Sequence, residues 1–137
     1  MRTGTRRQAR ERALQALYAM EIGRRDAGDA IAEVTAGDTA PKQRLFVNTL
    51  VYGVLEHRDE LDAVIAPRLE GWTMDRLSTI DRAILRMAVY ELLYMPETPP
   101  AVVASEAVAL AKRYSADNAA AFVNGVLGGL VRERAAG

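Results

Sequence analysis

Hydrophobic side chains recur along the chain at helical spacing, three or four positions apart, and the alternation typical of strands is nearly absent. The first helical stretch, Arg6 to Ile22, carries an apolar stripe of Ala9, Ala13, Leu17 and Met20, which predicts that one face is packed. The pattern therefore predicts an all-α protein. Further helices are predicted at about Asp29 to Thr35, from Pro41 with a stripe from Phe46 to His57, at Arg58 to Leu69, at Ile80 to Leu93, after Pro99 and Pro100 with a stripe from Val103 to Tyr114, and at about Asn118 to Arg134.

Breaks in the pattern come at residues that disfavour helix. Pro67 lacks a backbone amide hydrogen and clashes with the preceding turn, so it should kink or interrupt the Arg58 to Leu69 stretch. A turn is predicted at Gly71 to Met74, and we expect it to be the hinge between two halves of the chain. After it, Ser78 and Asp81 have the spacing of a helix start, with a capping serine and an acid in the first turn.

Two of the predicted helices have features beyond a single apolar face. Ile80 to Leu93 is apolar on most sides, which is typical of a central, buried helix. The last helix contains Gly125, Gly128 and Gly129, and each glycine inside a helix costs roughly 1 kcal/mol relative to alanine. Three such residues predict a close backbone approach to another helix.

Composition limits the chemistry that the chain can perform. Half of its 137 residues are hydrophobic, enough for the core of one domain, and none is cysteine. Disulfides, thiolate metal sites and cysteine nucleophiles are therefore excluded, and a reducing compartment is favoured. The one histidine, His57, lies on a core stripe, where we expect a satisfied, partly buried side chain and no ordinary zinc site.

Other functional patterns are also missing from the sequence. It contains no phosphate-binding glycine loop and no convincing Ser/His/Asp arrangement, so we expect a binding protein without cofactor, metal or catalysis. No apolar run approaches the length that spans a bilayer, and no signal-peptide pattern follows the first arginines. We therefore expect a cytoplasmic protein that does not bind membranes.

Positive charge is concentrated at the start of the chain. The whole chain has 18 basic and 18 acidic residues, but residues 1–12 hold five arginines and one glutamate, a net charge of +4. Such a cluster attracts a polyanion even when the whole protein is neutral. Arg6 and Arg10 are one helical turn apart, so both guanidinium groups can follow one nucleic-acid backbone. From these residues alone, nucleic-acid binding and a merely solvated terminus both stay open.

Trp72, beside the predicted turn, also has two interpretations, as a packing anchor or as a base-stacking residue.

The chain resembles the NusB family of bacterial transcription antitermination factors in four segments, which are, in order, RRQARERALQALY, TIDRAILRMAVYEL, EAVALAKRY and FVNGVL. The similarity covers almost the whole chain and is weakest at residues 23–39. It is most specific in the C-terminal half, where AILR-x-A-x-YEL, a proline-containing loop, EA-x-x-LAK and FVNG-x-L follow at the family's spacings.

The resemblance implies an all-α fold of two packed antiparallel three-helix bundles, with six to seven helices. We expect a single domain over residues 1–137, with subdomains of about 1–71 and 72–137. The implied function is non-enzymatic. Family members bind the single-stranded boxA element of nascent ribosomal RNA together with a small-subunit ribosomal protein, called NusE in this role. With other Nus factors, the complex acts on RNA polymerase and suppresses premature termination.

The resemblance also implies two binding surfaces. Arginines of the first helix would contact RNA phosphates, and aromatic side chains would stack on unpaired bases, although core packing stays an alternative for Phe122 and Tyr18. The implied RNA-binding residues are Arg2, Arg6, Arg7, Arg10, Tyr18, Asn118 and Phe122. The implied NusE-binding residues are Arg76, Leu77, Ile80 and Asp81.

Two positions depart from the family pattern, and two other functions stay open. Gln8 removes a charge where the arginine run often continues, whereas Asn118 replaces an aspartate that would repel phosphate more, so their net effect on RNA affinity stays open.

One alternative function is that of an accessory RNA-binding module of RNA modification or ribosome assembly, because the same fold occurs in an RNA cytosine methyltransferase. That enzyme would need a downstream catalytic domain, which we do not expect because the sequence ends at Gly137. The other is a homodimeric stored form that covers the RNA surface.

Overall fold

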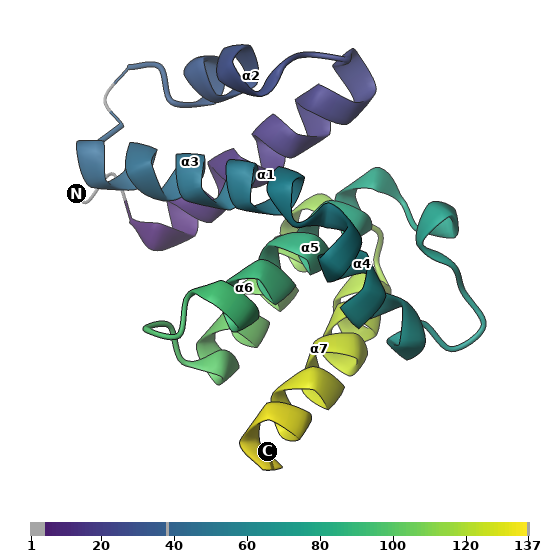
Figure 1. Ribbon diagram of the computed structural model, residues 1–137. Helices are drawn as coiled ribbons and strands as arrows, with labels where there is room; N and C mark the ends of the chain where they lie inside the picture. The colour runs from purple at the N-terminus through teal and green to yellow at the C-terminus, as the bar shows by residue number, and fades with distance from the viewer. Residues whose placement is uncertain (1–4, 38, 137) are drawn as a thin grey trace. The chain divides into compact units, whose positions relative to one another are not determined.

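The computed structural model describes residues 5–37 and 39–136, and the predicted all-α character is confirmed for them, because they include seven α-helices and no strand. Arg2, one of the implied RNA-binding residues, lies outside the described residues. The helices are α1 (Arg6–Gly23), α2 (Ala27–Val34), α3 (Pro41–Glu56), α4 (Arg58–Ile65), α5 (Thr79–Tyr94), α6 (Pro100–Tyr114) and α7 (Ala119–Ala136), with the short 3-10 helices η1 (Ala66–Arg68) and η2 (Met74–Arg76) (Figure 1).

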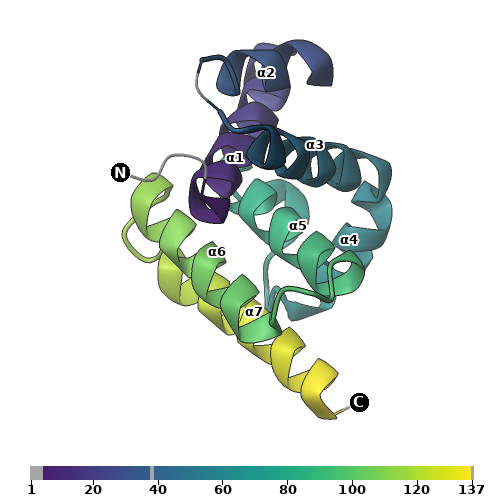
Figure 2. The same cartoon turned by 90° about the vertical axis from the view of Figure 1, so that its left-hand side faces the viewer.

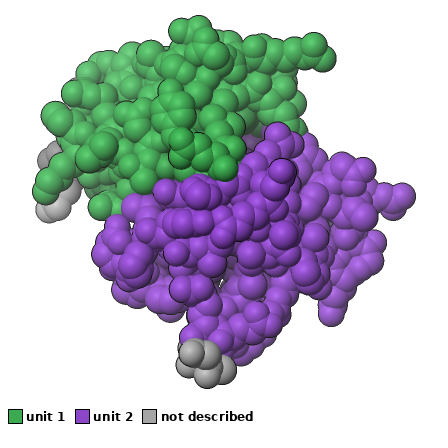
Figure 3. All heavy atoms as spheres, in the orientation of Figure 1, with its two compact units in different colours: residues 1–56 green, residues 57–137 purple. Residues whose placement is uncertain are grey.

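The chain divides into two compact units, residues 1–56 and residues 57–137, coloured separately in Figure 3. This division falls after Glu56 and not at the predicted turn, Gly71 to Met74. The physical reason is that α4 packs on α5, so it belongs with the helices that follow it. The turn therefore lies inside the second unit. The assignment of residues 1–137 to a single domain stays a prediction.

In the first unit, α1 packs against both α2 and α3, and α2 also contacts α3 (Figure 1; Figure 2). The predicted α1 stripe is buried at Ala9, Ala13 and Leu17 and half-buried at Met20. The second helix begins two residues earlier than predicted. The carboxylate of Asp26 accepts a hydrogen bond from the amide of Asp29 at 2.8 Å, so it caps a helix that starts at Ala27.

The segment from His57 to Arg68 behaves as its sequence predicts. α4 ends at Ile65 and the chain continues as η1, which contains Pro67, so proline ends the regular helix. His57 separates α3 from α4 and is half-buried. Its ring centroid is 4.4 Å from that of Tyr94, and its Nδ1 is 3.2 Å from a carboxylate oxygen of Glu60. This is the satisfied, partly buried histidine that the sequence predicted.

The central helix of the second unit is α5, which contacts α4, α6 and α7. Ser78 caps it by accepting a hydrogen bond from the amide of Asp81 at 3.1 Å, as predicted. Its middle is buried, with every residue from Ala83 to Val89 inside the unit, and Ile84 has no exposed surface. Two charged side chains, Arg86 and Glu91, are buried with the apolar ones. Arg86 donates through Nε and Nη2 to both carboxylate oxygens of Asp62 on α4, at 2.7 and 2.9 Å. Charged, bidentate pairs of this kind are strong and geometrically specific.

The glycines of α7 do not have the role that the sequence predicted. A side-chain carbon at Gly125 would meet no neighbouring atom within 4 Å. At Gly128 and Gly129 the nearest atoms belong to the guanidinium groups of Arg132 and Arg68. The prediction of a close backbone approach is therefore wrong. Gly125 leaves open space on the surface of α7, whereas arginine side chains lie against Gly128 and Gly129.

Candidate nucleic-acid interface

The basic start of α1 is fixed by a capping box. The hydroxyl of Thr5 accepts a hydrogen bond from the amide of Gln8 at 3.1 Å, and the side-chain oxygen of Gln8 accepts one from the amide of Thr5 at 3.3 Å. Both bonds satisfy amides that a helix N-terminus leaves unpaired. An arginine has no acceptor atom and could not complete this box. Gln8, which interrupts the arginine run, therefore helps to fix where α1 begins.

Two arginines of α1 lie against the ring of Phe46, on α3. The guanidinium carbon of Arg6 is 4.0 Å from the ring centroid, and that of Arg10 is 5.3 Å away. The negative face of an aromatic ring attracts such cations, so the ring restrains both side chains. Their accessibility differs, because Arg6 is exposed whereas only 5% of Arg10 is exposed. Arg6 therefore presents its charge to solvent, and Arg10 is a buried cation.

The remaining arginines of α1, and Tyr18, also differ in exposure. Arg7 is exposed beside Arg6, whereas Arg12 is half-buried and donates a hydrogen bond to the hydroxyl of Thr39. Tyr18, two turns beyond Arg10 on α1, is 41% exposed, so core packing alone does not explain it. Arg6, Arg7 and Tyr18 are thus the predicted RNA-binding residues of this unit that solvent reaches readily.

In the second unit, residues implied for RNA and for NusE line one groove of about 280 Å³, which we call the Asn118 groove. It joins Asn118 and Phe122 with Arg76, Leu77 and Asp81, whereas Ile80 is half-buried and lies outside its lining. The full lining is Trp72, Arg76, Leu77, Ser78, Asp81, Asn118, Ala119 and Phe122.

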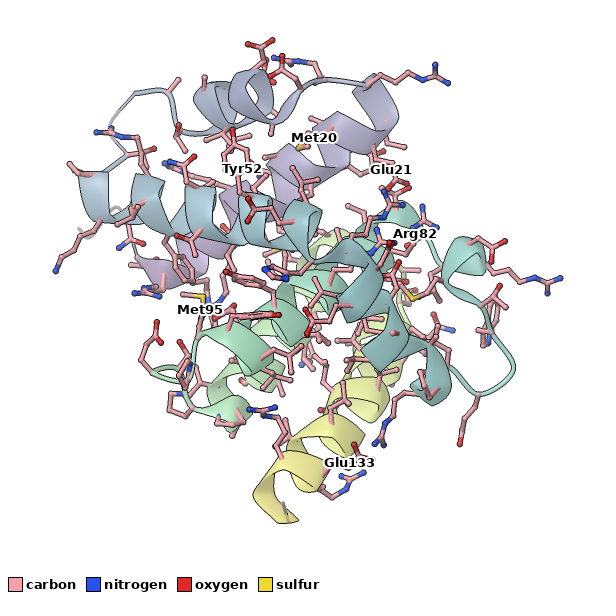
Figure 4. The ribbon with its side chains drawn as sticks, in the orientation of Figure 1. Met20, Glu21, Tyr52, Arg82, Met95 and Glu133 are labelled. Atoms are coloured by element: carbon pink, nitrogen blue, oxygen red, sulfur yellow. The ribbon has the colours of Figure 1, made fainter. Side chains whose placement is uncertain are left out.

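One wall of the Asn118 groove is the segment between η1 and α5, which is held by hydrogen bonds to backbone oxygens. Arg82 on α5 donates to the carbonyl of Leu77 at 2.6 Å and to that of Met74 at 3.3 Å (labelled in Figure 4). Asp81 accepts from the hydroxyl of Ser115 at 2.7 Å, which links the start of α5 to the end of α6. The predicted partner residue Asp81 therefore also has a structural contact.

The hydroxyl of Thr73 strengthens the same segment. It donates to the carboxylate of Asp75, and this hydrogen bond lowers the pKa of Asp75 below its ordinary value. Asp75 is therefore ionised near neutral pH, in the 3-10 helix that leads to Arg76.

A larger groove of about 630 Å³, which we call the Gly125 groove, adjoins the Asn118 groove, because Trp72 and Phe122 line both. Trp72 is 54% exposed, so packing alone does not explain this side chain. The full lining is Pro67, Arg68, Leu69, Glu70, Trp72, Ala121, Phe122, Gly125, Val126, Gly129, Arg132 and Glu133.

Sequence reasoning did not find either groove, or the role of Phe46 beside the arginines. Phe46 belongs to a core stripe, and no sequence signal separates an ordinary core aromatic from one that also carries two guanidinium groups. Within the described residues 5–37 and 39–136, no group of three or more His, Asp or Glu side chains could hold a metal ion. Over the same residues, no helix is both long and apolar enough to cross a membrane.

The proteins to which this chain is similar belong to one class, the bacterial transcription antitermination proteins. One such protein, NusB of Bacillus velezensis, is 48% identical over 122 residues, which cover 89% of this chain and 92% of that protein. The chain belongs to the NusB family, whose sequence pattern matches residues 7–132. The family predicted from the four segments is therefore confirmed.

Solved structures agree with this assignment and confirm the predicted fold class. NusB of T. maritima superposes with a TM-score of 0.89 at 34% identity, covering 97% of this chain and 94% of that one. A structure of the antitermination factors NusB and NusE in complex with double-stranded RNA gives a TM-score of 0.83 at 28% identity, with coverage of 93% and 96%.

Proposed function

We propose that this chain binds boxA-type single-stranded RNA of ribosomal RNA transcripts together with the ribosomal protein NusE. The complex acts on RNA polymerase with other Nus factors and suppresses premature termination, without catalysis and in the cytoplasm. The observation that carries the proposal is the arginine-rich start of α1, where the capping box fixes the helix and Phe46 restrains two of the arginines. The related complex of NusB, NusE and RNA supports the choice of partners.

The RNA surface would use two kinds of contact. Arg6, Arg7 and Arg10 would attract phosphates, with Arg2 as a further contact, and Tyr18 and Phe122 would meet bases. The contribution of phosphate contacts to the affinity falls as the salt concentration rises, whereas that of base stacking is nearly independent of salt. The neutral amide of Asn118 would repel the RNA less than a carboxylate does. These roles follow from the family's motif, and the exposure of Arg6, Arg7 and Tyr18 supports them at those three positions.

Phe122 gives a sharp test of the RNA surface. In binding titrations of boxA-type RNA against a scrambled RNA, Phe122→Ala should weaken boxA binding by about 1–3 kcal/mol while the salt slope stays unchanged. Phe122→Leu is the matched control, because leucine keeps apolar volume but has no aromatic face. If Phe122 stacks on a base, the Phe122→Leu variant should also lose RNA affinity, while the melting temperature of this variant stays near that of wild type. If wild type itself does not prefer boxA-type RNA, the proposed function is wrong.

Arg76, Leu77, Ile80 and Asp81 would contact NusE. Asp81→Lys should weaken NusE binding, while RNA binding by the chain alone persists, and a cation at the helix N-terminus should cost about 0.3–1 kcal/mol of stability. The matched control is Ser115→Ala, which removes the same hydrogen bond but keeps the carboxylate. If both variants bind NusE as wild type does, the partner surface lies elsewhere.

A further inference from the structure

The second unit carries an exposed aromatic side chain on a rigid turn. Gly71 adopts a φ of +83°, which favours glycine, and the amide of Trp72 donates to the carbonyl of Leu69 at 2.6 Å. The indole of Trp72 nevertheless stays more than half exposed. An aromatic ring on a fixed turn loses little conformational entropy when it binds a ligand. The turn therefore presents the indole for binding and does not bury it.

The floor beside Trp72 is open because α7 has little side chain there. Gly125 lies in the middle of α7, is exposed, and has no atom within 4 Å of the position that a side-chain carbon would take. An alanine would fit there without strain and would favour the helix. Packing therefore does not require a glycine at this position. The open floor lets a flat group approach the α7 backbone beside the indole.

The rim of the Gly125 groove is balanced in charge. Arg68 and Arg132 contribute two positive charges, Glu70 and Glu133 contribute two negative ones, and Arg68 is paired with Glu133, on the C-terminal part of α7 (Figure 4). A phosphate site needs a net positive lining, which is absent here. The edge of a nucleobase needs both donors and acceptors, which arginine and glutamate supply. The rim therefore matches a base better than a phosphate.

The Gly125 groove also continues the surface proposed for RNA, because Trp72 and Phe122 line both it and the Asn118 groove. We propose that the Gly125 groove holds an unpaired RNA base stacked on Trp72, next to the part of the RNA that contacts Asn118 and Phe122. This inference rests on the proposed RNA binding and extends it by one base-binding pocket. Its contribution is stacking in a neutral pocket and not phosphate attraction.

Trp72 is the only tryptophan of the chain, so tryptophan fluorescence reports on the two grooves that this residue lines, and Gly125 variants single out the Gly125 groove. The full-length protein is titrated with boxA-type RNA while Trp72 emission and RNA binding, by anisotropy of a labelled RNA, are followed separately. Wild type should show quenching that saturates with binding. Gly125→Leu should fill the groove, remove the quenching and weaken binding roughly 5- to 150-fold, with an unchanged salt slope. Gly125→Ala, the matched control, should leave the groove open and bind within about twofold of wild type.

The outcomes separate this proposal from the broader one. If RNA binds Gly125→Leu as tightly as wild type and quenches Trp72 emission to the same extent, the base pocket is wrong while RNA binding stands. If NusE alone quenches Trp72 and Gly125→Leu loses only NusE binding, the groove belongs to the protein partner and the base pocket is again wrong. If wild type binds no RNA, the proposed function fails first. Should Gly125→Leu not fold, Trp72→Leu at the exposed turn tests the affinity alone, by anisotropy of the labelled RNA, with the same loss of affinity expected.

Discussion

Arg6 and Arg10 should respond differently to the same substitution, although both lie against Phe46. Arg6 is exposed, so Arg6→Gln removes a charge from the surface and at most an exposed cation–π contact of about 0.5–1 kcal/mol. Arg10 is 95% buried, so Arg10→Gln removes a charged group from packed surroundings, at a cost of about 1–3 kcal/mol. Stability should therefore report mainly on Arg10.

RNA binding should show the opposite order. One lost phosphate contact lowers the salt slope by about 0.7 for a single strand, which is about fivefold in affinity at 0.1 M salt relative to 1 M. We expect this change for Arg6→Gln, because its guanidinium group is open to solvent. For each kcal/mol of stability that it loses, Arg10→Gln should change the salt slope less than Arg6→Gln does.

The assay is a salt titration of boxA-type RNA binding for wild type and both variants, with thermal melting of the same samples. For a chain of this length, 1 kcal/mol corresponds to a shift in melting temperature of roughly 4 °C. The reasoning is refuted if Arg10→Gln melts at the wild-type temperature, because the buried cation would then contribute nothing. It is also refuted if Arg6→Gln binds RNA with the wild-type affinity and slope.

Three further predictions concern the second unit. Ile84→Ala should lower the unfolding free energy by about 2–5 kcal/mol in denaturant titration, because Ile84 is fully buried in α5. Asp62→Ala should cost about 3 kcal/mol by leaving Arg86 buried without this carboxylate, and melting near wild type would contradict this. The hydroxyl of Tyr94 donates to Glu60, and this bond raises the pKa of Tyr94. The bond stabilises the fold below the ordinary tyrosine pKa and is lost as pH rises through the raised one, so Glu60→Ala should shift tyrosinate absorbance to lower pH.

Helix positions were predictable because they depend on local patterns. Ser78 caps α5, Pro67 ends α4 and His57 is half-buried as expected, since capping, proline geometry and apolar periodicity act within a few residues. The predicted start of α2 was two residues late, although the capping of this helix by Asp26 is also a local effect.

The candidate surfaces were harder to predict because they depend on tertiary placement. Sequence could name Phe122 and Asn118 through the family's motif, but it could not show that they share a groove with Arg76 and Asp81. Glycines in a helix indicate positions where a side chain is disfavoured. The sequence does not show whether another helix or a ligand occupies the space beside them. At Gly125 the structure shows no protein atom there.

The pair of Arg86 and Asp62 has a consequence for how α5 finds its orientation during folding. A helix that is apolar on most faces can rotate or slip against its neighbours with little loss of hydrophobic burial, so burial alone specifies its register weakly. A shift of one residue would turn the guanidinium group of Arg86 by about 100° around the helix axis, away from Asp62 and into apolar surroundings. We therefore expect the charged pair to select one register of α5, even where two apolar residues would give equal stability.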